Sequence, residues 1–81
     1  MSERLVLKGA LSEKKTRRMQ MAAKAAGLIT GIKHIIQPAA VIPLKDLKTE
    51  EALSLMKELH ELVQEYLQVS REVEELEREF S

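Results

Sequence analysis

The sequence contains no cysteine and no tryptophan, and its aromatic residues are Tyr66 and Phe80 alone. Without cysteine, neither disulfide bonds nor thiolate zinc sites can reinforce the fold, and this composition fits the reducing cytosol. The chain also lacks an uncharged apolar run of about 18 residues, the length typical of a transmembrane helix. Residues 1–9 have neither a long apolar segment nor a small-residue cleavage site, which argues against secretion. We therefore expect a soluble cytoplasmic protein with no membrane association.

The short length of the chain limits it to one small domain, residues 1–81. At this size a single hydrophobic core contributes only about 3–5 kcal/mol unless something reinforces it. Because cysteine is absent, oligomerisation is the remaining common means of reinforcement.

The clearest positive feature is an unbroken heptad pattern in the last third of the chain. Alternating steps of three and four residues select apolar positions throughout: Ala52, Leu55, Leu59, Leu62, Tyr66, Val69, Val73, Leu76 and Phe80. With Ala52 at heptad position a, every g position is a glutamate: Glu51, Glu58, Glu65, Glu72 and Glu79. The pattern predicts a helix that lies along another helix, with a row of carboxylates that orients the partner.

Two prolines, Pro38 and Pro43, divide the chain, because each disfavours helix at the residue before it. The predicted elements are a first helix over 12–36, a connection over 37–49 and a second helix over 50–80. Thr49 or Asp46 is the candidate N-cap of the second helix. The predicted fold class is therefore all-α, an antiparallel helical hairpin with coiled-coil-like packing.

The start of the first helix is less clearly marked. Ser12 is a candidate N-cap for a helix beginning at Glu13, and Gly9 discourages extension toward the N-terminus. Residues 1–11 are then an N-terminal arm. Within it, residues 5–7 are either extended or an added helical turn, and both alternatives stay open.

The contact between the two helices is predicted by laying their apolar positions antiparallel. In this register Ile36 meets Leu55, and small residues of one helix face large residues of the other, as close packing requires. The residues predicted to form this helix-pairing seam are Ile29, Ile32, Ile36, Leu55, Leu59, Leu62, Tyr66, Val69, Val73 and Leu76. Lys15 and Arg18 interrupt the seam near Glu72, where their charges meet carboxylates.

A two-helix hairpin buries one stripe per helix, yet both helices carry further apolar residues. The predicted oligomer face consists of Met21, Leu28, Ile35, Met56 and Val63. Leaving these residues exposed would create a larger apolar patch than soluble monomers usually show. We therefore expect a homodimer, closed as a twofold antiparallel four-helix bundle.

Charge is distributed unevenly along the chain, although the net charge is zero. Residues 1–24 carry seven basic and two acidic residues, whereas residues 50–81 carry ten glutamates and three basic residues. We expect the two ends to pair with each other. The alternative is a nucleic-acid-associated accessory protein, with phosphate contacts from Lys14, Lys15, Arg17 and Arg18. The isoelectric point of about 6.7 and the scarcity of aromatic residues make this alternative the weaker one.

No catalytic, metal-binding or cofactor-binding constellation is found in the sequence. His34 and His60 are predicted on different sides of the hairpin, where they cannot converge on a metal ion. The glutamates near the C-terminus lie at a solvated helix end, which lacks the desolvation that acid–base catalysis needs. The prediction is a non-enzymatic structural or interaction protein that self-associates and offers its surface to a protein partner, whose identity the sequence does not indicate.

Several segments together resemble a known group of proteins. They are Leu11-Ser12-Glu13, the pair Arg17-Arg18, Leu28-Ile29-x-x-Ile32-Lys33 ending at Pro38, and the acidic helix that follows. In this arrangement the chain resembles small helical proteins carried by Mu-like prophages. The resemblance covers most of the chain and implies a helical hairpin, but it carries no activity or functional residue over to this protein.

Overall fold

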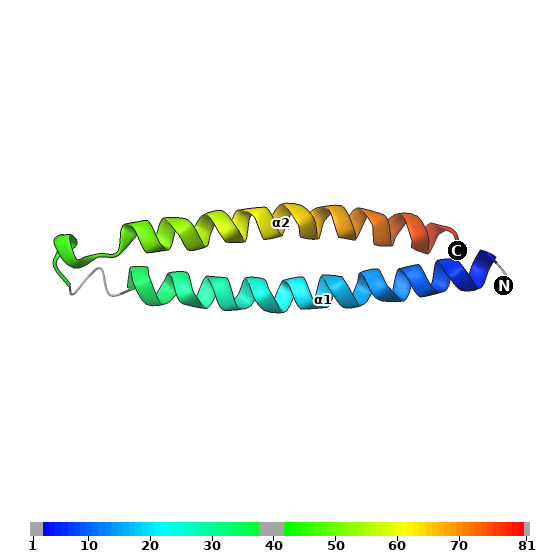
Figure 1. Ribbon diagram of the computed structural model, residues 1–81, viewed down its shortest axis with the longest axis horizontal. Coiled ribbons are helices and arrows are strands. Elements are labelled where there is room, and N and C mark those ends of the chain that lie inside the picture. The colour runs from blue at the N-terminus through cyan, green and yellow to red at the C-terminus, as the bar shows by residue number, and fades with distance from the viewer. Residues whose placement is uncertain (1–2, 38–41, 81) are drawn as a thin grey trace.

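Two long helices lie side by side and antiparallel in the computed structural model, which describes residues 3–37 and 42–80 (Figure 1). Helix α1 spans Glu3–Ile36, a short 3-10 turn η2 spans Leu44–Asp46, and helix α2 spans Thr49–Arg78. The start of α1 and the end of α2 lie at the same end of the hairpin, here called the open end (Figure 1). The predicted all-α antiparallel hairpin is confirmed.

The hairpin is a rod one layer of helices thick, measuring 63 × 19 × 15 Å between Cα extremes. Within the described part of the chain, no helix combines the length and apolar character needed to cross a membrane.

Helix α1 begins nine residues earlier than the predicted helix start at residue 12. The prediction of an N-terminal arm over 1–11 is therefore wrong for the described residues 3–11, which are helical. Leu7 lines the same surface hollow as Leu76 of α2, and the Arg4 guanidinium lies 5.6 Å from the centre of the Phe80 ring. These neighbours on α2 favour the helical form of this segment, which includes Gly9 at a cost of about 1 kcal/mol.

The connection leads into α2 without the predicted caps. Thr49 is the first helical residue of α2, and Lys48 occupies the N-cap position without a side-chain hydrogen bond. The Ala52 backbone N–H donates to the Lys48 carbonyl at 3.1 Å, so the first turn closes through the backbone. Pro38, predicted to end the first helix, lies outside the described residues.

The heptad positions of α2 face α1. Ala52, Val69 and Val73 are buried. The remaining positions of the pattern are half-buried: Leu55, Leu59, Leu62, Tyr66, Leu76 and Phe80. The predicted seam of the second helix thus coincides with the side that packs on α1.

The stripe of α1 that faces α2 differs from the predicted one. Met21 and Ile32 are buried at 7% exposure, and Leu28 and Ile35 are half-buried. The residues predicted in the seam, Ile29 and Ile36, are 41% and 49% exposed. Both predictions for α1 need correction: Met21, Leu28 and Ile35 belong to the seam, and Ile29 and Ile36 lie beside it.

The glutamate row of α2 favours this choice of stripe. In the predicted register Met21, Leu28 and Ile35 would lie opposite that row and leave its carboxylates against apolar side chains. In the observed register Arg17 and Lys24 lie opposite the row instead. Opposite charges across a helix pair select its rotation and register, because the like or unpaired arrangement costs free energy.

The best-buried part of the core lies toward the open end of the hairpin. Met21, Val69 and Val73 form a buried cluster, and Leu11, Leu62 and Tyr66 pack against it. Val73 is 1% exposed and Val69 is 2% exposed. These positions are therefore among the most completely buried parts of the contact between the helices.

Candidate interaction surface

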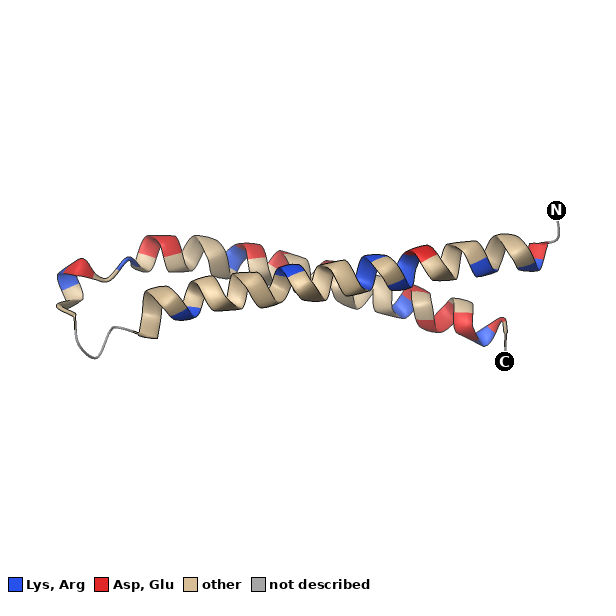
Figure 2. Cartoon of the chain, turned by 90° about the horizontal axis from the view of Figure 1, so that it is seen from below, with Lys and Arg blue, Asp and Glu red and all other residues tan. Residues whose placement is uncertain are grey.

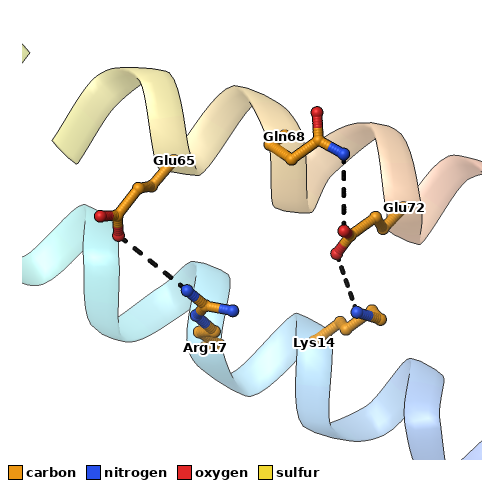
Figure 3. A network of polar contacts seen from close by, with 5 residues as sticks. All are labelled: Lys14, Arg17, Glu65, Gln68 and Glu72. Atoms are coloured by element: carbon orange, nitrogen blue, oxygen red, sulfur yellow. Dashed lines mark hydrogen bonds and ion pairs between the residues drawn. The ribbon is translucent and has the colours of Figure 1, made fainter. Parts of the chain in front are cut away.

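One side of the hairpin is lined by ion pairs between the helices, and we call it the ion-paired flank. Its pairs join nitrogen and oxygen atoms 2.8 Å apart in Lys14–Glu72, 3.9 Å apart in Arg17–Glu65 and 3.8 Å apart in Lys24–Glu58. The first two are drawn in Figure 3. The three carboxylates are consecutive g positions of α2, so the sequence pattern places them on one side.

Glu72 is the most heavily engaged of these carboxylates. Its Oε2 accepts a hydrogen bond from Lys14 Nζ at 2.8 Å, and its Oε1 accepts a longer one from Gln68 Nε2 at 3.5 Å (Figure 3). The hydrogen bond from Lys14, followed by the one from Gln68, holds the pKa of the Glu72 carboxyl below its usual value. Glu72 therefore stays ionised at neutral pH.

The residues predicted as phosphate contacts are mostly engaged with carboxylates. Lys14 and Arg17 take part in the ion-paired flank, and Lys15 Nζ lies 3.3 Å from Glu77 Oε1 on the opposite side of the hairpin. Arg18 is half-buried beside the contact between the helices, and it belongs to none of the ion pairs found in the described part of the chain. The predicted pairing of Arg18 with Glu72 is corrected, because Lys14 occupies that carboxylate.

The other side of the hairpin carries an open apolar groove of about 460 Å³. Met21, Ala25, Leu62 and Tyr66 contribute to it from the contact between the helices. Its outer edges are Ala22, Ala26 and Ile29 of α1 and Val63 and Leu67 of α2. Ile36 and Met56 lie seven residues, or about two helical turns, beyond Ile29 and Val63 toward the connection, so they extend the same two edges.

We call this surface the apolar flank, defined by Ala22, Ala26, Ile29, Ile36, Met56, Val63 and Leu67. All seven side chains are exposed. Met56 and Val63 lie on the predicted oligomer face, whereas Ile29 and Ile36 take the places predicted for Leu28 and Ile35. The sequence contained this information, because α1 has adjacent apolar residues at 21–22, 28–29 and 35–36.

The apolar character of this flank is confined to the half of the hairpin next to the connection. The same helical positions nearer the open end hold Lys8 and Lys15 in α1 and Glu74 and Glu77 in α2. Figure 2 shows most of the basic residues of α1 in its first half, with fewer toward the connection, and acidic residues along the last turns of α2. One flank therefore has a mainly apolar half, in which Lys33 and His60 occupy the positions one heptad from Ala26 and Leu67, and a charged half.

Among the described residues, no group of three or more His, Asp or Glu side chains is placed to hold a metal ion. His34 and His60 are both exposed and lie on different helices.

The architecture defines a class, the all-α antiparallel hairpin of two long helices packed together. No protein-family model matches the chain, and no curated protein or solved structure shows significant similarity to it. The resemblance to helical proteins of Mu-like prophages therefore remains a prediction from the residues named above.

Proposed function

We propose that this protein is a non-enzymatic structural or interaction protein that works as a self-associated hairpin, with the apolar flank as its contact surface. The observation that carries the proposal is the groove between Ile29 and Val63, whose walls are apolar on both helices. Contiguous exposed apolar surface of this kind is typical of protein contact sites.

The surface area of the chain supports association. The hairpin exposes 6408 Å². A compact monomer of 9.2 kDa exposes about 4,900 Å², so the chain has roughly 1,500 Å² in excess. Stable dimers bury about 800 Å² or more on each partner. Covering one side of the hairpin with a second copy would therefore supply the missing layer of the core.

The ion pairs of Lys14, Lys15, Arg17 and Lys24 do not favour the nucleic-acid alternative. Phosphate binding would have to displace the glutamates that already neutralise these side chains. A different protein that covers the same flank is the competing occupant, and the oligomeric state of the purified chain separates it from self-association.

Sedimentation equilibrium of the purified chain at micromolar concentration tests the proposal. We expect about twice the monomer mass of 9.2 kDa. A helical protein that stays monomeric up to about 100 μM would overturn self-association, since that corresponds to a binding free energy weaker than about −5.5 kcal/mol.

A further inference from the structure

We infer that two hairpins join apolar flank to apolar flank around a twofold axis parallel to the helices, so that both connections lie at the same end of the dimer. Helix α1 of each copy then packs against α2 of the other. This inference rests on the proposed self-association and adds the arrangement of the partner.

Symmetry allows two ways to stack the same face of a hairpin on itself. An axis along the helices keeps the two connections together and places α1 over the partner's α2. An axis across the helices places α1 over the partner's α1 and puts the two connections at opposite ends of the dimer. Both arrangements produce antiparallel neighbours, so helix direction alone does not separate them.

The distribution of apolar side chains favours the axis along the helices. The exposed apolar residues of the flank lie in the half next to the connection, and the groove ends near Ala22 and Leu67. With the axis along the helices, apolar half covers apolar half. With the axis across them and full overlap, Lys15 and Glu77 of the charged half would cover Ile36 and Met56 of the other copy, at the cost of desolvating charges against apolar surface.

The charges at the open end favour the same arrangement. Lys15 already lies 3.3 Å from Glu77 within the chain. With the axis along the helices, Lys15 also approaches the partner's Glu74 and Glu77, which creates an alternating cluster of opposite charges. With the axis across the helices, Lys15 approaches the partner's Lys33, a like charge that disfavours the contact.

Distance measurement between spin labels tests the arrangement, and the cysteine-free chain allows labels at single introduced sites. Lys45→Cys places a label on the exposed turn η2, at the tip of the hairpin. With the axis along the helices the two labels lie within about 30 Å, because packed helices are about 10 Å apart. With the axis across the helices they are separated by close to the 63 Å length of the rod.

Gln64→Cys is the matched control, since Gln64 is exposed near the middle of α2 and its labels stay close in either dimer. Short distances at both sites support the inference. A long distance for Lys45→Cys with a short one for Gln64→Cys overturns it and leaves self-association standing. A monomer mass, with no dipolar coupling at either site, overturns both proposals and assigns the apolar flank to a different partner.

Discussion

The ion-paired flank and the apolar flank lie on opposite sides of the same core, but different kinds of side chain line them. On the ion-paired flank, lysine and arginine side chains of α1 reach the glutamates of α2, and the charges of the two helices satisfy each other. On the apolar flank, small and aliphatic side chains leave a groove. One flank is closed by contacts within the chain, whereas the other leaves its apolar side chains exposed.

The two kinds of contact also differ in the free energy that they contribute to the hairpin. Exposed ion pairs contribute only about 0.2–1 kcal/mol each, because solvent and salt screen them. They nevertheless favour the observed rotation of α1 against α2, since the other rotation leaves the glutamate row facing apolar residues. Apolar burial supplies the larger free energy and favours the same stripe of α1, which has Leu7 and Met21 where the adjacent stripe has Lys8 and Ala22.

The largest effect is expected from a charge on the apolar flank. Val63→Glu would bury an unpaired carboxylate in the proposed dimer, at a cost of about 3–5 kcal/mol. The dissociation constant should rise at least about 100-fold, as measured by sedimentation equilibrium. Gln64→Glu adds the same charge one residue further on, at an outward position, and should leave the mass unchanged. Equal dimerisation of the two variants would contradict the assignment of this flank as the contact surface.

A comparison of two methionines tests which stripe of α1 forms the core. Met21→Ala removes a side chain that is 7% exposed, and we expect the free energy of unfolding to fall by about 2–5 kcal/mol. Met19→Ala, at a position 73% exposed, should change it by less than about 0.5 kcal/mol. Urea denaturation at one fixed protein concentration measures both. Similar losses in the two variants would mean that the stripe through Met21 does not face α2.

The ion-paired flank is tested by a double-mutant cycle on Arg17 and Glu65, whose nearest charged atoms are 3.9 Å apart. The coupling energy between Arg17→Met and Glu65→Gln should be about 0.2–1 kcal/mol in low salt. It should shrink in about 1 M salt, where the screening length is near 3 Å. A coupling that salt leaves unchanged would show that packing, rather than charge, joins these residues.

The smallest effect concerns pH and Glu72. Because the Lys14 hydrogen bond lowers the pKa of Glu72 in the folded chain, its ionised form stabilises the fold. This contribution is present above the ordinary glutamate pKa of about 4.3 and is lost as pH falls through the lowered value. Glu72→Gln should therefore be less stable than the native chain at neutral pH, and the difference should shrink below about pH 4.

Glu61→Gln is the control for this pH dependence, because Glu61 is exposed on α2 and belongs to none of the ion pairs among the described residues. Chemical denaturation at several pH values measures the difference for each variant. If the loss caused by Glu72→Gln were independent of pH, the ion pair with Lys14 would not be its cause.

The sequence by itself determined the all-α antiparallel hairpin and the buried side of α2. The pattern from Ala52 to Phe80 has one apolar position at each three- or four-residue step, so it allows only one rotation of that helix. The glutamates at the g positions likewise determined which side of α2 is charged. Met56 and Val63 lie off this pattern and are 47% and 40% exposed.

The tertiary structure alone decided which face of α1 is buried and where α1 begins. Leu28 and Ile29 are adjacent and similarly apolar, as are Ile35 and Ile36, so a heptad can be drawn through either stripe. The choice becomes visible only with α2 in place, where Arg17 and Lys24 lie beside its glutamates, Leu28 is half-buried and Ile29 is exposed. Contacts distant in sequence also extend the helix through Gly9, because Arg4 and Leu7 gain partners near the C-terminal end of α2. Local propensity contains no information about such partners.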